Sequence, residues 1–203
     1  MPELPTIGAP PRERADAARN RKRILDAADR LFARSGVAGV SLDAIAAEAG
    51  VGKGTLFRRF GSKAGLASAL LDERERELQA AVLTGPPPLG PGAPAADRLR
   101  AFIASYLELL EHNLELVHVS ETAHPGARYD VGAYQFWRLH VSVLLAELDP
   151  DLDAEYAAHA LLAPLGADLN RALTNQGFGY QRIRDGLTAL VERLIGGTPA
   201  REP

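Results

Sequence analysis

The sequence predicts an all-α fold of about nine helices, and three observations support this prediction. Apolar residues recur at three- and four-residue intervals through most of the 203 residues, which is the period of an amphipathic helix. No stretch alternates apolar and polar residues for long enough to be a convincing strand. Glycine, proline and capping residues interrupt the pattern where helices would end. The composition, 46% hydrophobic and 24% charged, is that of a globular protein rather than a disordered chain.

The chain is predicted to begin with a tail and one amphipathic helix. Residues 1–11 contain four prolines and little periodicity, and we assign residues 1–18 to a flexible tail. The apolar positions of the first helix, Ile24 and Phe32 among them, lie on one face. We expect that helix to end near Gly36, because glycine adopts the left-handed conformation of a helix C-cap at little cost.

Two short helices and a long one are predicted next. Ser41 is placed to cap a helix from Leu42 to about Ala49. A third helix runs from about Gly52 to Phe60, and Ser62 caps the fourth. That fourth helix is marked by three leucines, Leu66, Leu70 and Leu78.

The segment TGPPPLGPGAP, residues 84–94, divides the chain into two portions. Five prolines and three glycines in that segment exclude a helix interior. Beyond it, the same apolar spacing predicts helices over residues 99–110, a further stretch to about Thr122, and then residues 137–148, 152–175 and 181–195. We expect Pro164 to kink the helix over residues 152–175.

Residues 41–60, SLDAIAAEAGVGKGTLFRRF, have the pattern of a helix-turn-helix. Such a motif needs small residues where two short helices meet and a glycine in the turn between them. Alanines at 46, 47 and 49 and Gly50 meet both requirements. The second helix presents hydrogen-bond donors from Lys53, Thr55, Arg58 and Arg59, while Leu56 and Phe60 face the core. The pattern therefore places Lys53, Gly54 and Thr55 in a DNA major groove.

The distribution of charge also favours a polyanion as partner of the first portion. Residues 12–63 contain 12 basic and six acidic residues, a net charge of +6, although the whole chain carries −3. Residues 84–203 contain nine basic and 15 acidic residues. A basic N-terminal portion on an acidic remainder indicates that only the first portion meets nucleic acid.

The stretch from Arg21 to Leu66 resembles the DNA-binding domain of the TetR family of bacterial repressors. The resemblance rests on three ordered pieces, RILDAADRLFARSG, then SLDAIAAEAGV, then GKGTLFRRFGSK. Two positions depart from the usual pattern, because the family usually has tyrosine at the position of Phe57 and often histidine at that of Arg59. The first exchange removes a hydroxyl group that often reaches a phosphate, and the second adds a charge.

The resemblance implies a domain organisation and a set of DNA contacts. It implies a helix-turn-helix domain over residues 19–66 and a ligand-binding and dimerisation domain over residues 67–203. The implied DNA-binding residues are Ser41, Leu42, Lys53, Gly54, Thr55, Phe57, Arg58, Arg59 and Lys63. Among them, Lys53, Gly54 and Thr55 read bases and grip phosphate, Phe57 packs on the sugar-phosphate edge, and Lys63 binds phosphate beside a helix N-terminus.

The second portion is expected to dimerise and to bind a small effector. A two-fold operator requires a dimer, and the wide apolar stripes of residues 152–195 are predicted to form a homodimer surface. A pocket for a largely apolar effector is predicted among the aromatic and semi-polar residues of the middle region. The candidate ligand-binding residues are Phe102, Tyr106, Trp137, His140 and Asn170.

Other functions are less well supported by the sequence. Histidines at 112, 118 and 124 are six residues apart, a spacing that does not align them on one helix face, so no metal site is predicted. The absence of cysteine excludes thiolate chemistry, and no cofactor or catalytic residue is predicted. The alternatives are an all-helical enzyme or small-molecule carrier without DNA binding, and an architectural DNA-binding protein without an effector.

The expected location is the cytoplasm. The start MPELPTIGAP lacks the basic and apolar regions of a signal peptide. The longest apolar runs are far shorter than the roughly 18 residues of a membrane span, so no membrane contact is predicted.

Overall fold

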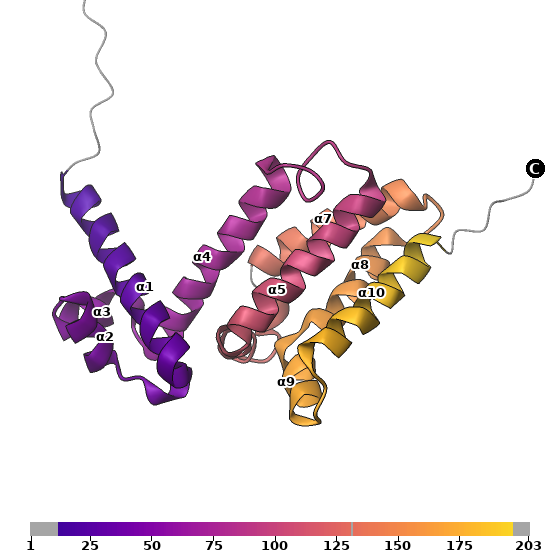
Figure 1. Cartoon of the computed structure of the whole chain (residues 1–203). Helices are drawn as coiled ribbons and strands as arrows, with labels where there is room; N and C mark the ends of the chain where they lie inside the picture. The colour runs from indigo at the N-terminus through magenta and orange to yellow at the C-terminus, as the bar shows by residue number, and fades with distance from the viewer. Residues whose placement is uncertain (1–11, 131, 197–203) are drawn as a thin grey trace, which may run out of the picture. The chain divides into compact units, whose positions relative to one another are not determined.

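A computed structural model describes the backbone of residues 12–130 and 132–196, and the side chains within these ranges from residue 16 onward. Every regular element in these ranges is a helix, which confirms the all-α prediction: ten α-helices and one 3-10 helix are present there (Figure 1). The chain forms two compact units, divided between Leu70 and Leu71. The first eleven residues, for which a tail is expected, lie outside the described residues.

The first unit consists of α1 (Arg12–Gly39), α2 (Leu42–Ala49), α3 (Lys53–Phe60) and the beginning of α4 (Lys63–Thr84). Residues 12–18 are therefore helical rather than part of the expected tail. Gly36 interrupts α1 with a φ of 66° and a ψ of 162°, so the first helix ends where the sequence predicts. The φ is positive as expected, but the ψ lies outside the left-handed helical region.

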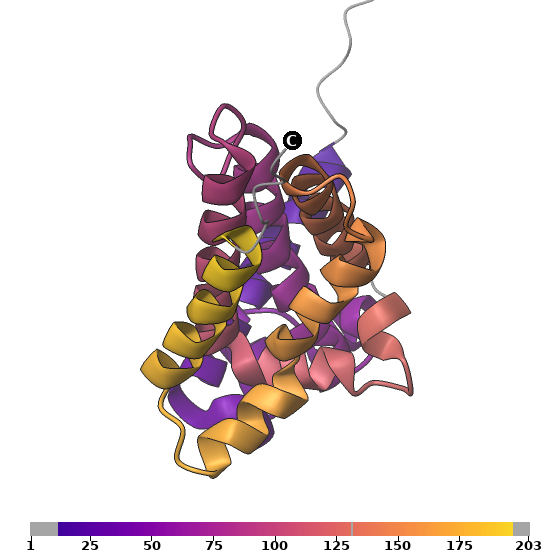
Figure 2. The same ribbon diagram turned by 90° about the vertical axis from the view of Figure 1, so that its right-hand side faces the viewer.

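The second unit is built around α5 (Ala95–Glu121). This helix packs against α7 (Gly132–Leu148), α9 (Ala167–Asn175) and α10 (Tyr180–Gly196), as Figures 1 and 2 show. A further helix, α8 (Ala154–Leu162), pairs with α7. One continuous hydrophobic core joins these helices to the second half of α4 through Leu78 and Val82.

Two details differ from the sequence prediction. The single helix predicted over residues 152–175 is two helices, α8 and α9, separated by the 3-10 helix η1 (Ala163–Leu165). Pro164 lies in η1, where its missing N–H and its ring end the α-helical hydrogen-bond ladder. A four-residue helix, α6 (Ala127–Asp130), was not expected, because it is too short to show a period.

Candidate functional site

The two short helices of the first unit are held at a fixed angle by their caps and their contact. The Ser41 hydroxyl group accepts a hydrogen bond from the Ala44 amide at 3.1 Å, which satisfies a free N–H at the start of α2. Gly50 ends α2 in the left-handed conformation, with φ 62° and ψ 40°. Ile45 of α2 and Leu56 of α3 are both fully buried. These local interactions fix α3 relative to α2, as the helix-turn-helix pattern requires.

Arg23 of α1 reinforces the turn between α2 and α3. Its guanidinium group donates to the carbonyl oxygens of Ala49, at 2.6 Å, and Gly50, at 3.3 Å. These contacts satisfy carbonyl groups that a helix C-terminus leaves free, and they place a positive charge at the negative end of the helix dipole. A Cβ atom on Gly50 would lie 2.7 Å from this guanidinium nitrogen. The turn therefore requires glycine for its backbone conformation, and a side chain there would also displace the Arg23 guanidinium group.

The outer surface of α3 carries most of the predicted DNA-binding residues. Its exposed side chains include Phe57, which is 60% exposed, Arg58 and Arg59, and Thr55 is half-buried. Within the described ranges, neither arginine forms an ion pair or a side-chain hydrogen bond. An exposed Phe side chain beside two unpaired guanidinium groups is suited to the edge of a polyanion, where the ring and the charges both find partners.

The two lysines of the predicted site are already engaged. The Lys53 ammonium group lies 2.8 Å from a carboxylate oxygen of Asp43 on α2. Lys63, which is half-buried, donates to the carbonyl oxygens of Ala38, at 2.9 Å, and Val40, at 3.0 Å. Only one of its three N–H donors is left for another acceptor. In this structure Lys63 therefore ties the start of α4 to the segment between α1 and α2.

The remaining predicted DNA-binding residues lie at the ends of these helices. Ser41 and Gly54 are exposed and Leu42 is half-buried. A Cβ atom on Gly54 would meet nothing within 4 Å inside the protein. Space around Gly54 is thus open to another molecule rather than filled by the fold.

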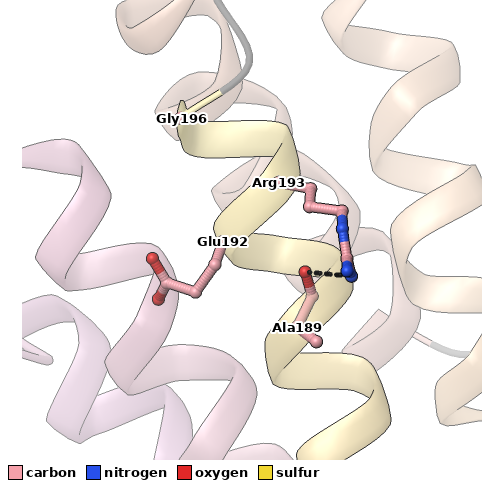
Figure 3. A pocket seen from close by; sticks show the side chains of 4 residues that line it. All are labelled: Ala189, Glu192, Arg193 and Gly196. Carbon is pink, nitrogen blue, oxygen red and sulfur yellow. Dashed lines mark hydrogen bonds between the residues drawn. The ribbon is translucent and has the colours of Figure 1, made fainter.

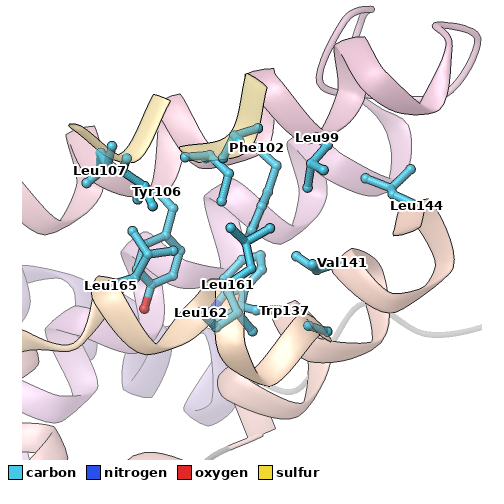
Figure 4. Close-up of a cluster of buried hydrophobic side chains, with 14 of the residues drawn as sticks. Leu99, Phe102, Tyr106, Leu107, Trp137, Val141, Leu144, Leu161, Leu162 and Leu165 are labelled. Carbon is cyan, nitrogen blue, oxygen red and sulfur yellow. The ribbon is translucent and has the colours of Figure 1, made fainter. Parts of the chain in front are cut away.

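Four of the five predicted ligand-binding residues lie together in the second unit. The ring of Phe102 lies 5.5 Å from that of Trp137 and 5.2 Å from that of His140, between centroids, and Tyr106 lies 5.8 Å from Trp137. Figure 4 shows that Phe102 and Tyr106 of α5 and Trp137 of α7 point into one shared interior. Burial, followed by the positive charge of Arg98, lowers the pKa of His140 to about 4, so its ring is neutral at pH 7.

Asn170, the fifth predicted ligand-binding residue, makes a different set of contacts. Its side-chain amide donates to the carbonyl oxygens of Pro164 and Gly166, each at 2.8 Å. These bonds join the start of α9 to η1 across the break that Pro164 causes. Its amide donors are therefore used in a structural contact at a helix junction.

A group of charged residues beside the aromatic cluster was not predicted from the sequence. Arg128 of α6 forms an ion pair with Glu121 of α5, donates to the Leu162 carbonyl oxygen at 2.8 Å, and lies 5.5 Å from the centroid of the Tyr134 ring. Glu121 also accepts a hydrogen bond from the Ala167 amide at 2.8 Å. One buried ion pair thus holds α5, α6, the end of α8 and the start of α9 together. Nothing in the local sequence around Arg128 indicates this pairing.

Glu75 of α4 was also missed, although its spacing in the sequence was a usable signal. It shares a helical stripe with Leu71, Leu78 and Val82, at positions i, i+4, i+7 and i+11 counted from Leu71. These three neighbours are at most 9% exposed. Burial, then the negative charges of Asp72 and Glu121, raises the pKa of the Glu75 carboxyl group to about 7.

Two hollows lie along α10. The first, of about 520 Å³, is an apolar groove between α9 and α10. Its lining includes Leu169, Leu173, Phe178, Leu187 and Leu190. The second has four lining residues, Ala189, Glu192, Arg193 and Gly196, all on the same helix (Figure 3). Glu192 of the second hollow is bound by Arg100 at 2.6 Å, and Arg193 donates to the Ala189 carbonyl oxygen at 3.3 Å, so both charged side chains of this hollow already have a partner.

Comparison with known proteins identifies the first unit. Residues 24–70 match the family model described as bacterial regulatory proteins, tetR family. This segment therefore has the sequence pattern of the TetR family. An HTH-type transcriptional regulator of Staphylococcus aureus is 47% identical over 53 residues, which make up 26% of this chain and 29% of that protein. The sequence likeness to this curated relative is thus confined to less than a third of the relative's length.

Solved structures share the fold over most of this chain. A TetR-family transcriptional regulator from Streptomyces coelicolor is 25% identical, with a TM-score of 0.66 over 89% of this chain and 96% of that chain. A second structure, of a protein from Saccharomonospora viridis described as a transcriptional regulator in complex with choline, is 25% identical. It has a TM-score of 0.62 and covers 86% of this chain and 96% of that one.

Two further observations bear on other kinds of function. No group of three histidine, aspartate or glutamate residues in the part of the chain that the structure describes is placed to hold a metal ion. In the same part, no helix combines the length and the apolar character that a membrane span requires.

Proposed function

We propose that this protein is a dimeric transcriptional regulator, a repressor that binds a palindromic DNA operator and releases it when a small, largely apolar effector binds. The observation that carries the proposal is the surface of α3. It presents two unpaired guanidinium groups, an exposed phenyl ring and the open space around Gly54. The caps and the Arg23 contact hold this surface rigid, and rigid donors read a groove with little loss of entropy on binding.

A second copy of the chain is the proposed occupant of the groove between α9 and α10. Leu169, Leu190 and Leu194 are 46%, 57% and 38% exposed, and small residues at 186 and 189 lie beside them on α10. Exposed leucines next to small residues allow two helices to approach closely and remove apolar surface from water. A dimer through residues 152–195 places two copies of α3 on one operator, as a two-fold DNA site requires.

The proposed effector site is the aromatic cluster of the second unit. A mostly apolar site with a few polar groups is typical for small organic ligands, and Phe102, Tyr106, Trp137 and His140 have this character. The choline complex of the Saccharomonospora viridis protein supports the idea that a protein of this fold holds a small ligand. The alternative is a helical enzyme or carrier that binds a small molecule but no DNA.

Selection from random DNA duplexes tests the proposal. The purified full-length protein should enrich an inverted repeat with half-sites about one helical turn apart. Arg58→Ala and Arg59→Ala should each weaken binding and reduce the slope of log affinity against log salt by about one for each phosphate group that is no longer neutralised. Arg34→Ala is the matched control, because Arg34 is an exposed arginine of the same unit on α1. Failure to enrich any sequence, with small-molecule binding intact, would favour the carrier.

A further inference from the structure

Glu75 is a half-buried residue on the apolar stripe of α4 and has no positive partner among the described residues. Its stripe neighbours Leu71, Leu78 and Val82 are 3%, 9% and 1% exposed, and the latter two belong to the core that also contains Trp137. In the described part of the chain, no arginine, lysine or histidine pairs with the Glu75 carboxylate. A carboxylate that is partly withdrawn from water without a counter-ion is unfavourable, and proteins seldom retain one without a use for it.

The groups that face Glu75 make its negative charge less favourable still. They are Asp72 on the same helix and Glu121 on α5, and the Tyr106 ring of α5 also interacts electrostatically with Glu75. Two cations lie in this region: Arg98 acts on His140, and the guanidinium group of Arg128 is already occupied by Glu121 and the Leu162 carbonyl group. No positive charge is among the groups that act on the Glu75 carboxyl group before any ligand binds.

The aromatic cluster supplies a second, independent sign of an absent partner. The indole N–H of Trp137 is buried and has no hydrogen-bond acceptor, and the Nε2 atom of His140 is likewise unpaired. Trp137 is only 1% exposed, and its ring meets Tyr106 edge to face at 5.8 Å. A buried N–H group without an acceptor is rare in native proteins, and a ligand is one of the few explanations for it.

We propose that Glu75 and the rings of Tyr106, Trp137 and Phe102 bind an organic cation, an amine or a quaternary ammonium compound. The positive charge pairs with the Glu75 carboxylate, and the faces of the rings stabilise the alkyl groups that surround the charge. The Trp137 N–H group then donates to an oxygen atom carried by the same ligand. This proposal rests on the proposed function, because it names the chemical class of the effector.

Binding of such a cation requires the rings to move. Phe102, Tyr106 and Trp137 are at most 5% exposed, so the ligand displaces side chains rather than fills an open chamber. The apparent affinity is then the intrinsic affinity multiplied by the fraction of molecules that are open. Movement of Trp137, which is the single tryptophan of the chain, gives a fluorescence signal that belongs to this site.

The test compares a cation with an uncharged molecule of the same shape. Tetramethylammonium, choline and benzyltrimethylammonium chlorides, and 3,3-dimethylbutan-1-ol as the neutral isostere of choline, are titrated into the full-length protein at constant ionic strength. Trp137 fluorescence and calorimetry report binding. The variants are Glu75→Gln and, as matched control, Glu77→Gln, because Glu77 lies on the same helix but is exposed. Circular dichroism checks that each variant is folded.

We expect at least one of the cations to bind at least tenfold more tightly than the neutral alcohol. Glu75→Gln should abolish this preference, and Glu77→Gln should preserve it. Cation affinity should fall about 30-fold from pH 8.5 to pH 5.5, since a carboxyl group with a pKa of about 7 is almost fully protonated at the lower pH.

Two results would overturn the proposal. One is equal affinity for choline and the alcohol, and the other is no saturable binding of any of the three cations at about 10 mM, where even a weak site fills. DNA binding is measured separately in the absence of these compounds. Cation binding without DNA binding would overturn the proposed function and leave the cation site standing, whereas the reverse result would remove only the cation site.

Discussion

Replacing Arg128 by methionine should destabilise the second unit by about 3–5 kcal/mol, the usual effect of removing one partner of a buried ion pair. The Arg128 and Glu121 side chains are 13% and 14% exposed. Methionine keeps most of the volume of arginine but none of its donors. It leaves the Glu121 carboxylate with the Ala167 amide as its remaining partner and leaves the Leu162 carbonyl oxygen without its donor at 2.8 Å.

Unfolding by heat and by urea, followed by Trp137 fluorescence, measures this effect in the unit that contains the pair. A change of 3–5 kcal/mol in a chain of this length lowers the midpoint temperature by about 10 °C. Arg138→Met is the matched control. Arg138 also pairs with a glutamate, Glu155, but that partner is 74% exposed, so its loss should change stability by less than about 1 kcal/mol.

The double variant Arg128→Met/Glu121→Gln separates the charge from the packing. Removal of both charges should recover much of the stability, because no buried charge then lacks a partner. Burial raises the pKa of Glu121 against the opposing effect of Arg128. Without Arg128 that pKa rises further, so the single variant should be less impaired at pH 5 than at pH 8. An Arg128→Met protein as stable as Arg138→Met at pH 8 would refute the assigned role of the pair.

Three further predictions concern other parts of the chain. Glu75→Gln should have the same free energy of unfolding as the parent near pH 4.5 and a higher one, by up to about 3 kcal/mol, at pH 8. The parent loses stability as the pH rises because the Glu75 carboxyl group ionises through its raised pKa of about 7. Identical urea unfolding curves of the two proteins at both pH values would contradict this. Leu194→Glu should give monomers by sedimentation, whereas Thr188→Glu, exposed on the same helix, should not; a stable Leu194→Glu dimer would place the interface elsewhere. Gly50→Ala should lower the melting temperature of the first unit, because φ is 62° and the new Cβ would meet Arg23; an unchanged transition would show that the turn tolerates a side chain.

The sequence predicted the first unit well because short-range interactions determine it. The caps at Ser41 and Gly50 and the buried position of Leu56 are local features, each decided by residues within a few positions. The end of the first helix at Gly36 was predictable for the same reason. Caps and apolar spacing can be recognised directly in the sequence, so they were enough to place these helices.

Side-chain contacts between positions far apart in the sequence could not be predicted in this way. The hydrogen bonds from Lys63 to the carbonyl groups of Ala38 and Val40 join positions 25 and 23 residues apart, and a motif that assigns Lys63 to phosphate carries no information about them. Arg23 lies in a run of basic residues, Arg21 to Arg23, and nothing in that run indicates that its side chain caps α2. For each of these basic residues, the local sequence suggests one role and the contacts in the folded chain give another.

The position of Glu75 on an apolar stripe was hard to notice because it lies within the charged run DERERE, residues 72–77. Six consecutive charged residues are usually read as a solvated helix surface. Glu75 does not fit that interpretation. Leu71, Leu78 and Val82 show which face of the helix is buried, and Glu75 lies on the same face. With leucine at position 75, the buried face of this helix would be an ordinary apolar stripe. The chain has a carboxylate there instead, in the same unit as a tryptophan N–H that has no acceptor, and both are departures from a standard core. A binding site explains the two together, whereas a packing account needs a separate reason for each.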